Sequence, residues 1–298
     1  MKNAWIERYF LIVPGILTLV SLAALLMFGL KPGIDLSGGS LLEVSYTGKM
    51  PTAEQVREAI APLPVGEVRV QPAGENSFIL KQRDLTPEEK AGLVSLLEKL
   101  GPLTENRFTS IGPALGAELR QKAWIAITLV ILSIILFITF AFRHVSKPVA
   151  SWKYGIVTIV TLVHDILIPM GLFALLGYLH GAEVDTLFIV GLLTILGLSI
   201  NDTIVVFDRI RENLRINEKG HHHHTFEETV WKSIVQTITR SINTSLTVVI
   251  VLLSLYFLGS ETTRDFSLML IVGMIAGTYS SILLAAPLLV AWEKWARK

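Results

Sequence analysis

The sequence predicts an α-helical polytopic membrane protein with six transmembrane helices and an α+β ferredoxin-like extracytoplasmic domain between the first and second helices. Only 17% of the 298 residues are charged and 51% are hydrophobic, whereas soluble proteins carry about 25% charged residues. Six apolar stretches are each long enough to cross about 30 Å of hydrocarbon. We place these spans at residues 9–30, 123–142, 152–178, 184–207, 242–258 and 266–291.

Basic residues gather on one side of these spans. They concentrate in the loops after the second and fourth spans and in the C-terminal tail, so the positive-inside rule places both termini in the cytoplasm. The expected organisation follows. Residues 1–30 form the first transmembrane helix, 31–122 the extracytoplasmic domain, and 123–298 a five-helix region with a cytoplasmic loop at 208–236.

The extracytoplasmic segment alternates strand and helix patterns. Strands are expected at 41–47, 67–71, 77–82 and 103–109, with one helix between the first and second strands and another between the third and fourth. Thr52 with Gln55 forms a capping box that opens a helix ending near residue 60. Thr86 followed by Pro87 and two acids opens the second helix. The resulting order, β-α-β-β-α-β, is the ferredoxin-like split pattern, and we interpret the segment as a binding or docking module.

A glycine-rich turn connects the first span to this domain. It reads Gly33-Ile34-Asp35-Leu36-Ser37-Gly38-Gly39. Its glycines permit a tight chain reversal, and Asp35 is placed to cap backbone groups of the turn. We favour this structural role over catalysis.

Asp202 is the most informative residue of the membrane region, because it interrupts the apolar run of the fourth span. A charge inside a span costs roughly 2.5 kcal/mol or more. At 1.5 Å per residue, Asp202 lies about 9 Å inside the cytoplasmic end of its helix. Arg240 precedes the apolar core of the fifth span at a similar depth, so the two side chains can meet between helices.

Other polar residues share helical faces with this pair. Thr237, Arg240, Asn243, Thr244 and Thr247 recur at three- or four-residue steps, and residues so spaced share one face. Ser199 lies one turn before Asp202, and Asn201 is its immediate neighbour. A polar stripe on an apolar helix indicates a bundle interior or a wet cavity. We therefore expect a hydrated pocket lined by Ser199, Asp202, Arg240, Asn243 and Thr244, with Asn201 supporting it.

The chemistry of such a pocket follows from solvation. Burial favours the protonated form of a carboxylate, and a nearby arginine favours the anion. A carboxylate balanced between these effects can load and release a proton, whereas arginine stays protonated. Asp202 is thus a candidate proton carrier and Arg240 its gate. A static ion pair that fixes helix packing remains the alternative.

Asp165 is a second candidate for the proton pathway. It lies about 12 residues into the third span, near mid-bilayer. His164 projects about 100° away on the helix, so the two side chains do not form an automatic pair, and we interpret His164 as a core residue. Helix packing is the alternative role for Asp165.

Several classes of function are disfavoured. A net charge of +1 gives no general field for nucleic acid, and the absence of cysteine excludes disulfides and thiolate metal sites. No phosphate loop, catalytic triad or zinc spacing is present, so we expect neither an enzyme nor a cofactor. The run His221 to His224 is compatible with metal binding, but no acidic or cysteine partner surrounds it and we assign it no function.

Several motifs together resemble one family. They are Gly33 to Gly39, Ser110 to Pro113, Gly116 to Arg120, Val163-His164-Asp165, the stretch from Ser199 to Asn213, and Thr239 to Ser245. These residues resemble the SecD/SecF family of protein-export membrane proteins, in the resistance-nodulation-division superfamily, and more closely its SecF half. The resemblance covers essentially the whole chain, apart from a loop around His221 that looks a few residues longer.

The resemblance implies a function in protein export. Members pair SecD with SecF in the cell membrane and assist the SecYEG channel and the SecA motor. They use the proton-motive force to promote export of unfolded preproteins. The family's transmembrane carboxylate and arginine correspond to Asp202 and Arg240.

Three other functions would each require different features of the chain. An intramembrane aspartyl protease needs two carboxylates at matched depth, and Asp165 and Asp202 differ by about 9 Å. A small-molecule or lipid exporter of the same superfamily needs a larger external domain. A structural partner of SecD without a proton-carrying role is the more serious rival.

Overall fold

The computed structural model describes residues 3–74, 76–141, 149–220 and 224–296. Three of the four histidines in the run at 221–224 therefore lie outside the described residues. Six helical segments of the described chain are long and apolar enough to cross a membrane, which confirms the expected fold class. The chain divides into two compact units, one of Met1–Lys31, Ala126–Glu183 and Leu187–Lys298, the other of Pro32–Ile125 and Val184–Thr186.

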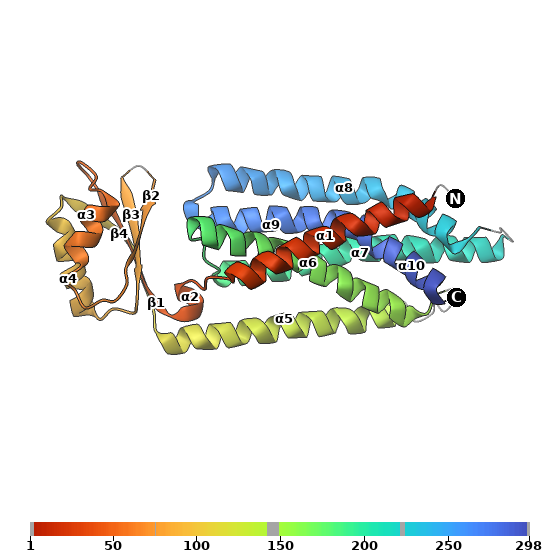
Figure 1. Cartoon of the computed structure of the whole chain (residues 1–298), viewed down its shortest axis with the longest axis horizontal. Helices are drawn as coiled ribbons and strands as arrows, with labels where there is room; N and C mark the ends of the chain where they lie inside the picture. Colours follow the sequence, from red (N-terminus) through yellow and green to blue (C-terminus); the bar gives the residue numbers. More distant parts are fainter. Residues whose placement is uncertain (1–2, 75, 142–148, 221–223, 297–298) are drawn as a thin grey trace. The chain divides into compact units, whose positions relative to one another are not determined.

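The smaller unit has the ferredoxin-like arrangement. Its elements are β1 (Gly39–Tyr46), α3 (Ala53–Ile60), β2 (Arg69–Ala73), β3 (Ser77–Gln82), α4 (Pro87–Glu98) and β4 (Leu103–Ile111). The sheet order is β2-β3-β1-β4, and every neighbouring pair is antiparallel. Helices α3 and α4 cover one face of the sheet (Figure 1). The β-α-β-β-α-β prediction is confirmed.

Local sequence explains why these elements form where they do. The predicted capping box at Thr52 is present, since the Gln55 N–H donates to Thr52 Oγ1 at 3.2 Å. The helix start expected at Thr86 is a capping box as well, in which the Glu89 N–H donates to Thr86 Oγ1 at 3.3 Å. Alternating residues of the sheet enter a core with the apolar faces of the two helices. The largest fully buried side chains of this core are Tyr46, Phe78, Leu42, Leu80, Leu93 and Leu97.

The two glycines before β1 are required by space as well as by backbone angle. Gly38 and Gly39 have φ of +81° and +142°, values that other residues rarely adopt. A Cβ at Gly39 would lie 2.6 Å from the carbonyl oxygen of Gln82, and one at Gly38 would lie 2.7 Å from Cα of Pro113. The glycines thus let the short helix α2 (Ile34–Ser37) turn into the sheet at close range.

Asp35 caps a different backbone segment from the one expected. Its Oδ2 accepts a hydrogen bond of 3.4 Å from the backbone N–H of Thr186, the first residue of α7, instead of capping its own turn. The neighbouring Gly33 N–H donates to the Val184 carbonyl at 2.8 Å. The structural role is retained, but it ties α2 to the segment before α7.

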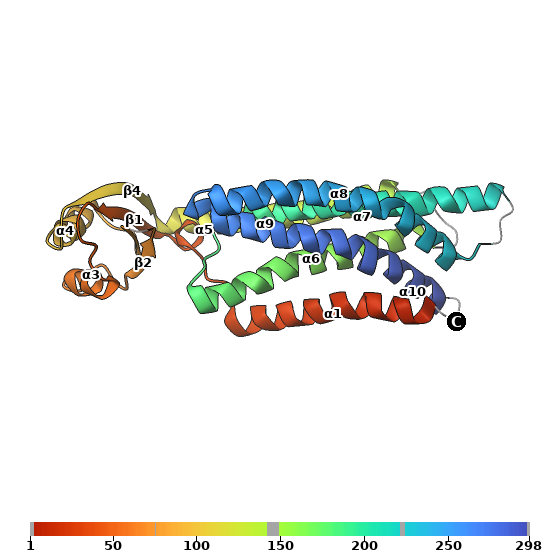
Figure 2. The ribbon, with the colours of Figure 1, turned by 90° about the horizontal axis from the view of Figure 1, so that it is seen from above.

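The membrane helices lie side by side (Figures 1 and 2). They are α1 (Asn3–Phe28), α5 (Pro113–Ala141), α6 (Ser151–His180), α7 (Thr186–Lys219), α8 (Phe226–Leu258), and a continuous last span of α9 (Glu261–Ser280), η1 (Ser281–Ala285) and α10 (Ala286–Ala296). The π-helical segment η1 precedes Pro287. Proline has no N–H to donate to residue 283, so the regular ladder cannot continue there.

Glycines allow two close helix crossings. A Cβ on Gly171 of α6 would lie 2.5 Å from Cα of Ser21 on α1. One on Gly277 of α9 would lie 2.9 Å from Cβ of Ser199 on α7, and Gly273 one turn earlier packs on Ile195. Small residues at four-residue spacing let backbones approach closely in membranes. The α7–α9 crossing therefore occurs at the residue that precedes Asp202 by one turn.

The segment 208–236, which connects the fourth and fifth spans, is largely helical in its described residues. Helix α7 continues to Lys219 and α8 begins at Phe226. Thr225 and Glu228 form a capping box, and Nδ2 of Asn213 donates to Ser233 Oγ and Gln236 Oε1 at 2.8 Å each. These polar contacts hold the extended helix ends together, a stabilisation that hydropathy alone does not reveal.

Candidate functional site

Asp202 lies in the middle part of α7 and is buried, with 7% of its surface exposed. The Arg240 guanidinium on α8 is close enough to interact electrostatically with its carboxylate, and the Ser241 hydroxyl lies beside it. Among the described residues the two charged groups form no direct ion pair. The structure thus brings together the predicted pair from two helices and leaves a separation between their charges.

The polar face of α8 turns outward. Arg240, Asn243, Thr244 and Thr247 are exposed, and so is Asn201 on α7. Arg240, Asn243 and Thr244 therefore do not enclose a buried pocket with Asp202 within this chain. The reason lies on the opposite side of α8. Small hydroxyl residues at four-residue steps, namely Ser233, Thr237, Ser241 and Ser245, are buried there, and such residues favour close helix packing.

Ser199 belongs to a different polar cluster. It is buried, and its hydroxyl donates to Oδ2 of Asp165 on α6. Oδ1 of the same carboxylate lies 2.8 Å from Nδ1 of His164, and Nε2 of His164 lies 3.0 Å from the Tyr279 hydroxyl on α9. Three helices therefore meet through one chain of hydrogen bonds.

His164 and Asp165 do pair, although adjacent positions on a helix do not pair automatically. Their Cβ atoms do project about 100° apart, but Nδ1 lies close to the histidine backbone, so rotation of the two side chains brings it to the adjacent carboxylate. Both side chains are buried, at 2% and 0% exposure. Pro169 adds to the local polarity, because it lacks the N–H that would bond the backbone carbonyl of Asp165.

Tyr279 is the member of this cluster that sequence reasoning missed. Its ring stands edge-on to the His164 ring, with centroids 5.4 Å apart. A signal was present, since Thr278, Tyr279, Ser280 and Ser281 form a polar run within an apolar span. Periodicity alone did not indicate which of these residues faces α6.

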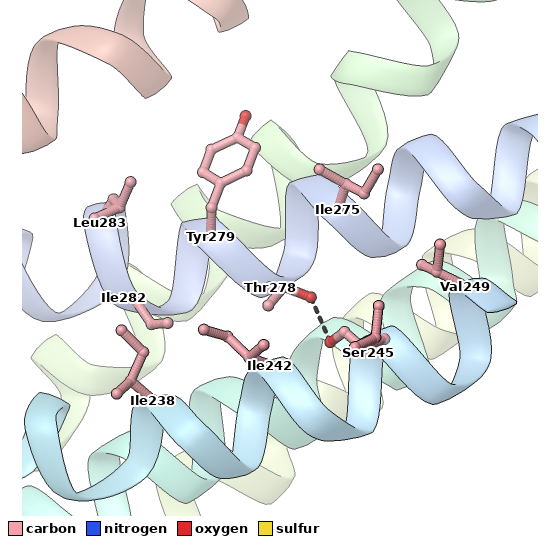
Figure 3. A pocket seen from close by; sticks show the side chains of 10 residues that line it. Ile238, Ile242, Ser245, Val249, Ile275, Thr278, Tyr279, Ile282 and Leu283 are labelled. Atoms are coloured by element: carbon pink, nitrogen blue, oxygen red, sulfur yellow. Dashed lines mark hydrogen bonds between the residues drawn. The ribbon is translucent and has the colours of Figure 1, made fainter.

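An apolar groove of about 500 Å³ runs between α8 and the α9–η1 span (Figure 3). Ile238, Ile242 and Val249 line one wall, and Ile275, Ile282 and Leu283 line the other. Within it the Thr278 hydroxyl donates to Ser245 Oγ at 2.5 Å. The groove presents no charged group. Within the described part of the chain no cluster of three potential metal ligands occurs either.

Comparisons with known proteins agree with these features. The family model described as protein export membrane protein SecD/SecF, C-terminal, matches residues 93–295, and the SecD/SecF GG motif matches residues 23–49. This chain belongs to the SecD/SecF family. The GG motif contains Gly38 and Gly39, the two glycines whose positive φ angles and close backbone contacts allow the turn into β1.

Several relatives named SecF match this chain over most of their own length. The protein translocase subunit SecF of Thermobaculum terrenum is 42% identical, covering 95% of this chain and 89% of its own. That of Anaerolinea thermophila is 38% identical with the same coverage. The Bacillus subtilis SecDF is 33% identical over 96% of this chain, which spans 37% of it.

Solved structures of SecDF show the same fold. The crystal structure of the translocon-associated SecDF from Thermus thermophilus has a TM-score of 0.83 at 33% identity and covers 97% of this chain. A SecDF structure in the super-membrane-facing form has a TM-score of 0.69 at 32% identity. The present chain spans 38% of the length of each of those chains. This chain is thus a multi-pass membrane protein related to protein translocase subunits.

Proposed function

We propose that this chain is the SecF subunit of a SecD–SecF complex that uses the proton-motive force to promote export of unfolded preproteins. The complex would act with the SecYEG channel and the SecA motor, in the inner or plasma membrane. Both termini would be cytoplasmic and the ferredoxin-like domain extracytoplasmic. Family membership supports the role in export, and the site around Asp202 supports the role of protons.

The observation that carries the proposal is a buried carboxylate in a membrane helix beside an arginine that is itself exposed. An arginine facing hydrocarbon is costly, by roughly 2.5–3.5 kcal/mol near the bilayer centre. Protein must therefore cover the polar face of α8. A SecD chain is the natural partner, because the SecDF relatives carry the corresponding region within a longer single chain.

The geometry suggests how proton binding would be coupled to movement. Arg240 stays protonated, so its approach to Asp202 favours the anion and its withdrawal favours proton uptake. The two groups interact without a direct ion pair. A small displacement of α8 against α7 would therefore change the proton affinity of Asp202. Conversely, proton binding at Asp202 would weaken the attraction between the helices.

Proton flux through the reconstituted complex tests this function. Asp202→Asn should reduce flux driven by an imposed pH gradient to the level of empty vesicles, while the two subunits still copurify. Asp208→Asn is the matched control. It removes a carboxylate on the same helix that pairs with Arg211 and is half exposed, and it should leave flux unchanged.

The rival function, a structural partner without proton movement, makes the opposite prediction. Replacing Asp202 and Arg240 together with leucine would then preserve late-stage export in membrane vesicles. Normal export by that double variant, or normal flux in Asp202→Asn, would show that Asp202 is not the proton carrier. If the wild-type complex shows no proton flux in the presence of an unfolded substrate, then the proposal of proton-coupled export is wrong.

A further inference from the structure

A second polar unit lies in the membrane region, separate from Asp202 and Arg240. It consists of Tyr279, His164, Asp165 and Ser199, which we call the Tyr279 chain. Its consecutive links are a hydroxyl–imidazole contact of 3.0 Å, an imidazole–carboxylate contact of 2.8 Å and a serine hydrogen bond to the second carboxylate oxygen. Every polar atom along it therefore has a partner.

The donors and acceptors can be assigned in one consistent direction. The carboxylate of Asp165 accepts from the Ser199 hydroxyl and from the Nδ1–H of a neutral His164. Nε2 of that tautomer has no hydrogen and accepts from the Tyr279 hydroxyl. A histidine that bridges a hydroxyl and a carboxylate in this way can pass a proton between them.

The two ends of the Tyr279 chain differ in exposure. His164, Asp165 and Ser199 are buried, whereas Tyr279 is only partly buried. Figure 3 shows the Tyr279 ring directed away from α8, while Thr278 on the same turn points to Ser245. Exchange of protons with the surroundings would therefore take place at Tyr279.

The other end of the chain touches a tight helix crossing. Ser199 lies where α7 meets α9, with only 2.9 Å between its Cβ and the position of a Cβ on Gly277. The neighbouring described side chains add little charge. Residues 10–28 of α1 and 126–141 of α5 carry no titratable group, and on α7 the next titratable residue is Asp202, one turn beyond Ser199. Helix α8, which packs on α9, carries Arg240 between Ile238 and Ile242 of the groove that Tyr279 also lines.

We propose that the Tyr279 chain is a second protonation unit, in which Tyr279 and His164 deliver a proton to Asp165 and Ser199 transmits the change to α7. The proposal rests on the proposed proton-coupled function, and it assigns His164 and Tyr279 as positioning and proton-transferring residues. Because Ser199 is one turn from Asp202, the state of Asp165 would bias the helix that carries Asp202.

A proton arriving at the Tyr279 oxygen displaces the phenolic proton to Nε2 of His164, and the Nδ1 proton moves to Oδ1 of Asp165. One proton has then entered, Asp165 is neutral, and His164 is neutral in its other tautomer. A neutral carboxyl group is a weaker acceptor for Ser199 than a carboxylate, so the contact between α6 and α7 loosens at the crossing with α9.

Two conservative variants test the proposal in the reconstituted complex with SecD. Tyr279→Phe keeps the ring and removes the hydroxyl. His164→Asn keeps an N–H donor near the position of Nδ1 and removes Nε2. Each should lower gradient-driven proton flux about tenfold, the scale of one lost hydrogen bond in a transfer path. The double variant should be no slower than the slower single variant, since both act on one path.

The pH profile distinguishes proton transfer from packing. Wild-type flux should rise as the pH on the proton-donating side falls, because each transfer begins with a proton that arrives at the Tyr279 oxygen, and His164→Asn should lose this dependence. Ser245→Ala is the matched control. It removes the hydrogen bond between Ser245 on α8 and Thr278 on α9, which lies beside Tyr279 but outside the Tyr279 chain. This variant should retain the wild-type flux and pH profile.

The outcomes separate this inference from the proposed function. Wild-type flux in Tyr279→Phe and His164→Asn, with Asp202→Asn inactive, overturns only the second protonation unit. An equal loss of flux in Ser245→Ala also overturns it, because the effect is then one of packing. Loss of flux in Tyr279→Phe with normal flux in Asp202→Asn supports the Tyr279 chain and shows that Asp202 is not the proton carrier. Absence of flux in the wild type overturns both.

Discussion

The crossing of α1 and α6 at Gly171 offers a direct test of the membrane packing. In Gly171→Ala the new Cβ would lie 2.5 Å from Cα, 2.6 Å from Cβ and 2.7 Å from the carbonyl oxygen of Ser21. Two of these three atoms are backbone, so a side-chain rotation cannot relieve the clash. Carbon atoms prefer separations of about 3.5–4.0 Å, so α1 must move about 1 Å away from α6.

The cost of this movement can be bounded. Added methyl groups in well-packed interiors cost about 1–3 kcal/mol, and alanine in place of glycine returns about 1 kcal/mol of helix propensity. Because two of the clashing atoms are backbone, the packing cost should lie in the upper half of that range, about 2–3 kcal/mol. The free energy of unfolding should therefore fall by about 1–2 kcal/mol. Gly197→Ala is the control, because no heavy atom outside its own helix lies within 4 Å of the new Cβ. Its unfolding free energy should stay equal or rise by up to about 1 kcal/mol.

Denaturant titration of the detergent-solubilised protein, followed by tryptophan fluorescence, measures both variants. If Gly171→Ala is as stable as the wild type, or if both alanines shift stability equally, then α1 does not cross α6 at this distance. A loss confined to Gly171→Ala supports the crossing.

Two further predictions concern the ferredoxin-like unit. Gly39→Ala places a Cβ 2.6 Å from the Gln82 carbonyl oxygen at a residue with φ of +142°. It should reduce the free energy of unfolding by about 1–3 kcal/mol and so lower the melting temperature of the full chain. Gly48→Ala is the control and should not lower it, because the space around Gly48 is open. The Arg83 ion pair and the Thr86 N–H lower the pKa of Glu89 to about 2 from 4.5. Because the folded pKa is depressed, this contribution to stability is present above about pH 4.5 and is lost as the pH falls toward 2. Melting curves should therefore separate wild type from Glu89→Gln at pH 6 and converge near pH 2, and a constant difference across this range would contradict the assignment.

Much of the architecture could be predicted from sequence because it depends on local chemistry. Apolar runs of sufficient length must form helices in a bilayer, and all six were found. The β-α-β-β-α-β order followed from alternation and from the capping boxes at Thr52 and Thr86. The ends of α7 and α8 were missed, since polar contacts such as Asn213–Ser233 extend them beyond the apolar run.

The candidate site was only partly predictable. The pairing of Asp202 with Arg240 was expected from matched depth along two helices, and the structure places them within electrostatic range. The assignment of Ser199 to that pair was wrong, because its hydroxyl bonds Asp165. Helical spacing gives the angle of a side chain on its own helix, but it does not say which neighbouring helix that angle faces.

The sequence alone determined the membrane class, the β-α-β-β-α-β unit and the presence of costly carboxylates within spans, because length, period and charge are local properties of a chain. Only the tertiary structure decided that the polar face of α8 is exposed and that Tyr279, His164, Asp165 and Ser199 form one chain. Both depend on the rotation of each helix against its neighbours. That rotation is set by the close contacts at Gly171, Gly273 and Gly277, between residues far apart in sequence.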